Sequence, residues 1–507
     1  MKGLFKTGLL SAAALPALSS AACISSGDQN TINNALSSGG AGAVVQLCQN
    51  ALIQITGQIS FTADNQEIST QGYPTGSTRA TIQIKPGNTA STIIQGAHHN
   101  GIKIKNIQLD GNRPNAGLQP GGGANIEIGG LSNGQVVQYV NSRNPRGWSC
   151  MHIIGSGQDS NPCRNATITN NDIGPCGQSG TDGNGNGRWA DGISLDCTNS
   201  LVQDNHIQGP TDGGVVIFGS PGSTINRNTI ISSDDYLGFG AINMVDGEYE
   251  GSYAGVTVSN NIITGGAKMF NLGIGIGANV WSFNDPFTLK GPATIINNRI
   301  TGHVSFPIAL NGWANGITIT GNDVSAVTSP KSSFSDASHC VPAIQTLFNQ
   351  NANFLYYPAG VTGQQNLQQG FAASSGNMTN FLCSSLPLPD SITFQKGQLN
   401  VVSDSGPFAD LHGSYAQYQG DSNVVVLASG SPVWASGHTL SQGCGSPSQC
   451  RLQFDSNGNL ATTYQGAVQW SSGTSGRGNT LVMINHAPWI QIKDASGNVI
   501  WDTTQSH

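Results

Sequence analysis

The chain has 507 residues, of which 9% are charged, and 20 Lys and Arg stand against 27 Asp and Glu, for a formal net charge of −7. Soluble domains usually carry about 25% charged residues. With an acidic balance and no basic stripe, we expect no nucleic-acid partner. The 68 glycines and the 37% hydrophobic content, without heptads or a collagen repeat, exclude coiled-coil, collagen and disordered chains and favour an all-β protein.

Residues 1–22 have the pattern of a secretory signal peptide. Lys2 and Lys6 precede an apolar stretch at 9–18, and small residues follow it. The stretch is too short to span a membrane, and no later segment is apolar enough to do so. We therefore expect a secreted, extracellular protein without a membrane span.

The ten cysteines favour disulfides, because their number is even and the chain carries a secretion signal. Chain order suggests the pairs Cys23–Cys48, Cys340–Cys383 and Cys444–Cys450. Two more bridges are expected among Cys150, Cys163, Cys176 and Cys197, whose pairing stays open. The sequons at Asn165 and Asn377 predict N-glycosylation.

A short motif recurs through the first two-thirds of the chain: a strand, one or two Asn, then an aliphatic residue. It reads TITNNDI at 167–173, LVQDNHI at 201–207, TINRNTI at 224–230, TVSNNII at 257–263, TIINNRI at 294–300 and TITGNDV at 318–324. A second strand series lies between these segments: NIEIGG, MHIIGS, GISLDC, GVVIFG, AINMVD, GIGIGA and PIALNG. Asn tolerates the left-handed conformation of a sharp bend, and its amide can bond from coil to coil in a ladder.

A period of 20–50 residues indicates a stacked repeat architecture. Over roughly residues 40–330 the pattern resembles the right-handed parallel β-helix of the pectate-lyase-like superfamily; an irregular β-sandwich is the alternative. We assign residues 23–335 to this β-helix. Residues 336–386 break the pattern, look helical or irregular, and are interpreted as a cap and connector.

Residues 387–507 contain three further repeats: QGDSNVVVL at 419–427, FDSNGNLATTY at 454–464 and KDASGNVIWD at 493–502. They resemble the bulb-type mannose-binding lectin family, whose motif is Q-x-D-x-N-x-V-x-Y in a three-fold β-prism. Gln419, Asp421, Asn423 and Val425 match that motif, with Leu427 in place of Tyr. The resemblance implies a mannose site in this first repeat. The repeat tryptophans Trp434, Trp470 and Trp501 are expected in the prism core.

Acidic residues cluster in the β-helix, where ten of the 27 fall within 182–250. Asp191 opens the strand DGISL and Asp212 opens DGGVVIF, with Asp234 and Asp235 following 22 and 23 residues later. If these intervals are single coils, the carboxyls stack along one edge at about 4.8 Å per step. Carboxyls stacked so closely share a proton or bind a ligand.

One interpretation is glycoside hydrolysis, which needs one carboxyl as acid and another as base or nucleophile. Asp191, Asp212 and Asp235 are the catalytic candidates, and Arg188, Trp189, His206 and Asp234 are the substrate-binding ones. The spacing of the two Asp-Gly pairs is similar to that of the polygalacturonase family. The Gly-His-Gly and Arg-x-Lys motifs of that family are not found at the corresponding spacing in this chain, so pectin specificity is not implied. A polysaccharide lyase is the alternative, with candidates Arg188, Lys268, His206 and Tyr236.

Each of these residues also has a structural interpretation, since Asp before Gly is a common turn residue and Trp189 can anchor a loop. Apart from calcium among the acids, no spacing indicates a metal, and no nucleotide motif indicates a cofactor, so we expect neither. The leading hypothesis is a monomeric secreted enzyme that cleaves a polysaccharide and is tethered to glycan by its lectin-like domain. A non-catalytic glycan-binding or adhesion protein is the alternative.

Overall fold

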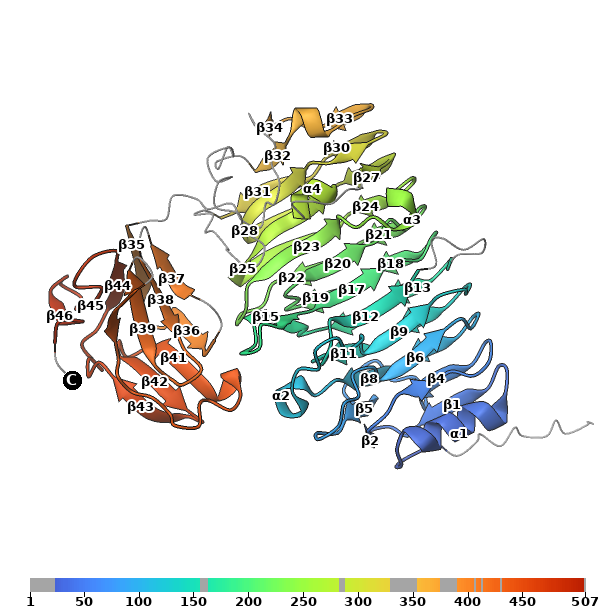
Figure 1. Cartoon of the computed structure of the whole chain (residues 1–507), viewed down its shortest axis with the longest axis horizontal. Helices are drawn as coiled ribbons and strands as arrows, with labels where there is room; N and C mark the ends of the chain where they lie inside the picture. The colour runs from blue at the N-terminus through green and yellow to red at the C-terminus, as the bar shows by residue number, and fades with distance from the viewer. Residues whose placement is uncertain are drawn as a thin grey trace, which may run out of the picture.

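The computed structural model contains a stack of parallel coils followed by a separate three-sheet domain (Figure 1). The expected signal peptide at 1–22, the expected pair Cys340–Cys383 and the sequon Asn377 lie outside the described residues. The described ranges are 23–155, 163–281, 288–328, 353–373, 390–404, 407–411, 414–428 and 431–505.

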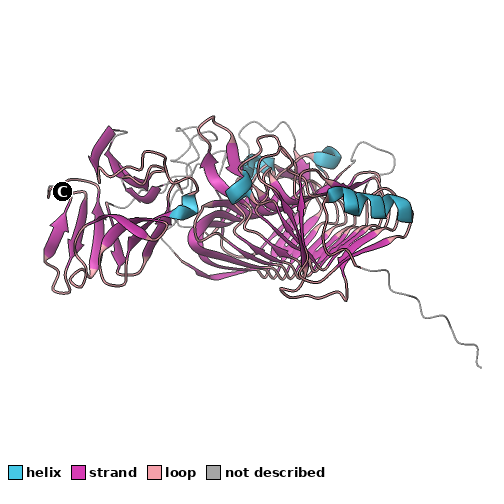
Figure 2. Cartoon of the chain, turned by 90° about the horizontal axis from the view of Figure 1, so that it is seen from below, coloured by secondary structure: helices cyan, strands magenta, loops and turns pink. Residues whose placement is uncertain are grey.

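The coil stack confirms the expected right-handed parallel β-helix. Each coil places one strand on each of three faces, and Figure 2 shows the strands in layers with the short helices outside them. The strands of the first face are β1 Val44–Leu47, β4 Glu67–Thr70, β7 Lys103–Lys105, β10 Val136–Gln138, β13 Thr167–Thr169, β18 Leu201–Gln203, β21 Thr224–Asn226, β24 Thr257–Ser259, β27 Ala293–Ile296, β30 Ile317–Thr320 and β33 Gln365–Leu367.

The second and third faces form one continuous sheet, because β25 and β28 run across both. The second face holds β2 Leu52–Ile55, β5 Ala80–Ile84, β8 Ile107–Asp110, β11 Asn141–Arg143, β14 Asp172–Ile173, β19 His206–Gln208, β22 Thr229–Ile231, the first parts of β25 Ile262–Ile276 and β28 Arg299–Leu310, and β31 Asp323–Val327. The third face holds β3 Ile59–Ser60, β6 Ile94–Ala97, β9 Ile126–Gly129, β12 Ser149–Ile154, β17 Asp191–Leu195, β20 Gly213–Ile217, β23 Gly238–Met244, the remainders of β25 and β28, β32 Phe354–Tyr356 and β34 Phe371–Ala373.

The loops between the faces contain short strands and helical turns. They are the hairpin β15 Gly177–Thr181 and β16 Gly187–Trp189, the pair β26 Leu289–Lys290 and β29 Trp313–Ala314, and the helical turns α2 Arg113–Ala116, α3 Glu248–Gly251, α4 Ala278–Trp281 and η2 Pro358–Gly360. The helix α1 Gln29–Gly39 covers the N-terminal end of the stack (Figure 1). Its N-cap Asp28 accepts the backbone N–H of Asn30 and Thr31, and it buries Ile32 and Leu36 on the first coils.

The bend between the first and second faces is built by the Asn residues that the sequence repeat singled out. Each side-chain Oδ1 accepts the backbone N–H and the Nδ2 of the Asn one coil earlier, at 2.8–3.1 Å. The ladder runs through Asn171, Asn205, Asn228, Asn261, Asn298 and Asn322 and ends on Gln368. These side chains are buried, and their mutual bonds satisfy polar groups that would otherwise be costly inside the coil.

Inside the stack, inward residues form columns of isoleucine and valine. Ile104, Val137 and Ile168 follow one another on the first face, each fully buried. A branched side chain so buried stabilises the fold by about 1.5–3 kcal/mol relative to exposure. The residues that flank Ile104 and Val137 on their strands are only partly buried, so these strands bury one side against the core.

The segment expected as a cap instead continues the β-helix where the structure describes it. β32 pairs with β28, β33 with β30, and β34 with β32, all parallel. The expectation of a helical or irregular segment is therefore wrong for residues 353–373. Its Gln- and Ala-rich sequence conceals strands whose apolar residues are buried, with Phe354 in the inner core and Leu355 in a second apolar cluster on the opposite side of the strand.

The C-terminal domain has three four-stranded antiparallel sheets, the arrangement expected of a β-prism. The repeat tryptophans Trp434, Trp470 and Trp501 meet edge to face, with ring centroids 5.9–6.1 Å apart, so their expected core position is confirmed. The sheets are β35 Ser391–Gln395, β44 Thr480–Ile484, β45 Ile490–Lys493 and β46 Val499–Asp502; β36 Leu399–Val402, β41 Cys450–Phe454, β42 Leu460–Tyr464 and β43 Ala467–Ser471; and β37 Pro407–Leu411, β38 Ser414–Tyr418, β39 Val424–Ala428 and β40 Ser431–Ala435, with η4 Pro447–Gln449 before β41.

Four disulfides join the described cysteines. Cys23–Cys48 and Cys444–Cys450 pair as expected. The open question among the four central cysteines resolves to Cys150–Cys176 and Cys163–Cys197. The first bridge joins β12 to the loop before β15, and the second joins the loops that precede β13 and follow β17.

Candidate active site

Two carboxyls meet where β17 and β20 begin on the third face. Asp191 is only 4% exposed. Its Oδ2 accepts Ser194 Oγ at 2.8 Å, and its Oδ1 accepts the backbone N–H of Gly213 at 2.9 Å. Burial, followed by repulsion from Asp212, raises the pKa of Asp191 well above its usual range. Asp212 is half-buried, so the pair combines a carboxyl that favours its protonated form with a more accessible one.

The acids do not form the straight column that their spacing suggested. Ile193 pairs with Val215, so Asp212 lies one residue out of step with Asp191, and its N–H donates to Ala190. The next coil is longer, since Gly213 pairs with Gly240. The expected stacking of Asp235 with the other two is therefore wrong.

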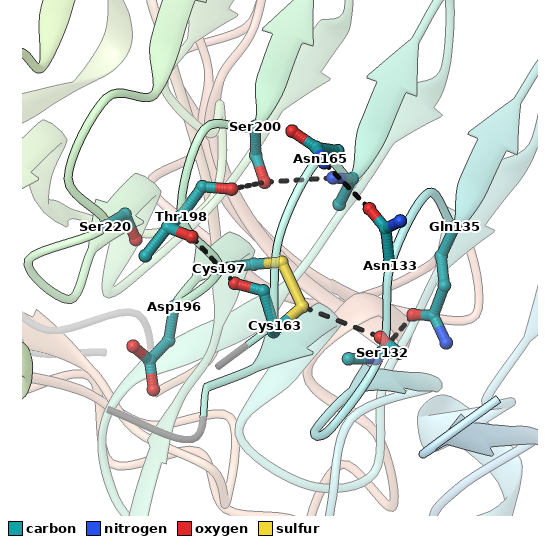
Figure 3. The surroundings of a disulfide bond; sticks show 12 residues. Ser132, Asn133, Gln135, Cys163, Asn165, Asp196, Cys197, Thr198, Ser200 and Ser220 are labelled. Carbon is teal, nitrogen blue, oxygen red and sulfur yellow. Dashed lines mark hydrogen bonds between the residues drawn. A yellow bond between two sulfur atoms is a disulfide. The ribbon is translucent and has the colours of Figure 1, made fainter. Parts of the chain in front are cut away.

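A second group of acids lies at the opposite ends of the same strands. Asp196 follows β17 and is largely buried; burial, then Glu248, raises its pKa to about 8. Asp246 adds to the rise in the pKa of both Asp196 and Asp191. Asp196 precedes Cys197, whose disulfide to Cys163 fixes this loop, and its carboxylate points away from the bridge (Figure 3).

Basic and phenolic groups gather in the loops that enter the third face from the second. Arg113 is buried; one Nη donates to the carbonyl of Arg188 at 2.8 Å. Burial, then the like charge of Arg188, lowers the pKa of Arg113 to about 10. Arg188 in turn donates to the carbonyl oxygens of Ser179 and Asp404, at 2.9 and 3.1 Å, the latter in the prism domain.

Asp235, Tyr236 and Lys268 belong to the same loop group. The Tyr236 hydroxyl accepts Gln178 Nε2 at 3.1 Å. Burial, then the charge of Asp235, raises the pKa of Tyr236 to about 12, and burial lowers that of Lys268 to about 8 against the opposing effect of Asp235. The lyase candidates Arg188, Tyr236 and Lys268 are thus linked through shared neighbours.

Three other expected substrate-binding residues have different surroundings. His206 opens β19 on the second face and pairs with Asp172 and Thr229, whereas Asp191 belongs to β17 on the third face. Trp189 packs on Phe239 with ring centroids 5.3 Å apart, as a loop anchor does. Asp234 is exposed in the loop before β23.

The outward side of the third face carries one column of residues that strand pairing aligns, here called the outer column. Its members are Gln95, Glu127, His152, Ser194, Val216, Asn243, Gly275, Ala309 and Leu355. Ala309 and Leu355 belong to a separate buried apolar cluster with Phe239, Leu272, Val280 and Phe306. This cluster covers the C-terminal half of the column, and the half with Gln95 and His152 is partly exposed.

Sequence reasoning missed a polar group in the open half of this column. His152 Nδ1 lies 2.7 Å from Glu127 Oε2, and the exposed ring of Trp148 meets the His152 ring edge to face at 4.7 Å. The sequence carried no clear signal, because Glu127 is the third residue of NIEIGG and His152 the second of MHIIGS. The register of β9 and β12 brings the two side chains together. Trp148 is also next to the acids, because its carbonyl accepts the N–H of Asp191 at 2.8 Å.

The expected mannose-binding residues lie at the turn between β38 and β39. Gln419, Asp421 and Asn423 precede the strand, and Val425 alone is in it, buried. The first three residues of the motif therefore lie outside the strand that carries Val425. Asp421 Oδ1 accepts the Asn423 N–H at 3.0 Å, and Asn423 Oδ1 accepts Ser436 Oγ at 3.0 Å, because a turn leaves backbone donors that side chains must satisfy.

Other sites can be placed briefly. Asn165 is exposed in a left-handed bend, a position open to modification. Within the described ranges, no three His, Cys, Asp or Glu side chains are arranged to hold a metal ion. No helix in the described part of the chain is long and apolar enough to cross a membrane.

Comparison with known proteins agrees with the fold. Residues 132–324 match the family model described as a right handed beta helix region. The A-module of a mannuronan C-5 epimerase from Azotobacter vinelandii is 14% identical over 72% of this chain and 97% of that one, with a TM-score of 0.46. A pectate lyase, Pel9A, is 13% identical over 68% of this chain and 84% of that one, with a TM-score of 0.38.

Other solved structures are similar to the C-terminal part of the chain. Monomeric mannose-binding lectins from Gastrodia elata are 25% identical over 23% of this chain and 96% of theirs, with a TM-score of 0.19. A comparison with curated proteins finds no match.

Proposed function

We propose that the chain is a secreted enzyme that cleaves a polysaccharide, specifically a glycoside hydrolase acting through Asp191 and Asp212. The observation that carries this proposal is the carboxyl pair of Asp191 and Asp212, in which burial and repulsion raise the pKa of Asp191 and favour its protonated form. A carboxyl held protonated beside an ionised one is the arrangement that glycosidic cleavage requires.

In this mechanism Asp191 supplies the proton to the leaving oxygen. Asp212, the more accessible member, acts as a carboxylate base on water or as a nucleophile on the sugar. Ser194 and the N–H of Gly213 hold the Asp191 carboxyl in place. The prism domain keeps the enzyme close to its substrate by binding glycan, which raises the local concentration of chain segments.

The test is release of reducing ends from a panel of neutral and acidic polysaccharides, with absorbance of unsaturated products followed in parallel. New reducing ends without that absorbance support hydrolysis. Loss of the signal in Asp212→Asn, with an unchanged melting temperature, assigns it to this site. Binding without cleavage of any glycan would favour the non-catalytic adhesion protein instead.

A polysaccharide lyase is the second candidate, favoured by the lowered pKa of Lys268. A lysine that loses its proton near neutral pH can act as a base, and Arg113 and Arg188 could neutralise a uronate. In that case cleavage would produce unsaturated ends, and Lys268→Met would abolish them. Asp212→Asn would then leave the rate nearly unchanged.

A further inference from the structure

The half of the outer column that contains Gln95, Glu127 and His152, here called the open half, lies next to Trp148. Together these residues provide three features that a sugar site needs. Trp148 offers an exposed aromatic ring, 37% accessible. His152 lies against that ring at 4.7 Å with its Nδ1 held by Glu127 at 2.7 Å. Aromatic rings give an apolar platform, and a fixed imidazole gives a directed hydrogen-bonding group.

Glu127 is itself held in place. Its Oε1 accepts the backbone N–H of Ala124 at 2.7 Å, and its side chain is 11% exposed. The carboxylate therefore orients His152 through one oxygen and is anchored through the other. This fixes the imidazole ring and leaves Nε2 as the nitrogen not engaged by Glu127.

The group also adjoins the carboxyl pair. The backbone of Trp148 bonds to that of Asp191, and His152 pairs with Ser194, which donates to Asp191. One coil step along a β-helix is about 4.8 Å. A polymer lying in this open half would pass from Trp148 to the acids.

We propose that Trp148, His152 and Glu127 form a binding subsite for an uncharged sugar unit of the polysaccharide, next to the cleavage point. The proposal rests on the proposed function for the identity of that polymer. The Glu127 carboxylate supplies negative charge in the column, and the proposed mechanism assigns a second carboxylate, Asp212, to the adjoining pair. A uronate would add a like charge in a poorly solvated place, so the subsite takes a neutral sugar.

The experiment measures retardation in native gels containing xylan, galactomannan, mixed-linkage glucan or polygalacturonate. All proteins are full-length and carry Asp212→Asn and Asp421→Ala, which removes turnover and the prism's own sugar site. Trp148→Ala should weaken binding to the preferred neutral polymer about tenfold, a loss of about 1.4 kcal/mol. Trp148→Phe should retain most of the affinity because it keeps a ring.

Tyr73→Ala is the matched control, since Tyr73 is an exposed aromatic, 44% accessible, after β4 on the first face. It should bind as the parent does. Glu127→Gln replaces the carboxylate that holds the His152 ring by a neutral amide, a weaker partner. It should therefore weaken binding, and it provides a second measurement if Trp148→Ala unfolds.

Unchanged affinity in both Trp148→Ala and Glu127→Gln would overturn the subsite, and preferred retention by polygalacturonate would overturn the neutral-sugar assignment. The two proposals fail separately. If the native enzyme cleaves but these variants bind normally, the subsite is wrong. If the variants lose binding but the native chain cleaves nothing, the hydrolase proposal is wrong.

Discussion

Replacing Asp191 by Asn separates a catalytic carboxyl from a turn residue, because the two roles predict opposite results. Asn has nearly the same shape and can still accept the Gly213 N–H through its oxygen. Its amide would face Ser194 Oγ, which already shares a 2.9 Å hydrogen bond with Ser149 Oγ and can turn to accept. The loss is then at most one neutral hydrogen bond, about 1 kcal/mol.

The pH dependence gives the sign of the effect. The pKa of Asp191 is raised in the folded state, so between the unfolded pKa of about 3.9 and the folded value the native state holds a proton that the unfolded state has lost. Wild-type stability should therefore fall through this window as pH rises, by up to about 1.4 kcal/mol per pH unit. Asp191→Asn removes this fall in stability, so the free energy of unfolding of the variant should rise relative to that of the wild type from about pH 4 upward.

Activity should move in the other direction. Losing a general acid costs about 10²–10⁴-fold in rate, so reducing-end release should nearly vanish at unchanged or greater stability. Thermal unfolding at two pH values and the reducing-end assay measure both quantities. Asp323→Asn, exposed on the second face with a lowered pKa, is the control and should keep full activity. An Asp191→Asn protein that is less stable at every pH yet fully active would refute the reasoning.

Three further predictions concern other parts of the chain. Asn261→Ala leaves two buried donors of the preceding coil without their acceptor and should lower the unfolding free energy by about 2–6 kcal/mol. Replacing the exposed Asn366 by Ala should change the unfolding free energy by less than about 0.5 kcal/mol. Equal effects of the two substitutions in denaturant titrations would contradict the role of the ladder. Asp196→Asn should flatten the fall in stability that burial of this carboxyl causes between about pH 4 and its pKa of about 8, and an unchanged slope in thermal melts would count against it. Asp421→Ala should abolish mannose saturation-transfer signals of the full chain and Asp455→Ala should leave them; the reverse result would move the site to the second repeat.

The architecture could be predicted from the sequence because each repeat contains the residues that its own coil or sheet needs in order to form. Asn171 and its successors recur wherever the coil bends, because each bend needs the same amide. The left-handed backbone is at the residue before the ladder Asn, such as Asn170 or Asn260. The repeat tryptophans marked the prism core for a similar reason. Both patterns are visible within one coil or one repeat, without knowing which coils are neighbours.

The candidate site was harder because it depends on register between coils of unequal length. Asp212 is one residue out of step with Asp191, and the 27-residue step from Gly213 to Gly240 leaves Asp235 in a loop. Glu127 and His152 are 25 residues apart and meet only when their strands pair. The number of residues between two positions does not predict whether their side chains will be neighbours on adjacent coils unless the lengths of the intervening loops are known.

The asparagine ladder has a consequence for how this fold can acquire new parts. Its successive members are 34, 23, 33, 37 and 24 residues apart, yet their hydrogen bonds stay within 2.8–3.1 Å. The hairpin β15–β16 and the helix α4 occupy two of the longer intervals. Because the ladder fixes the bend between the first and second faces in each of these coils, segments of a dozen residues can be inserted or removed at the other bends without changing how the coils stack. The scaffold thus lets the loops around the third face diverge in length while the coils beneath them stay in place.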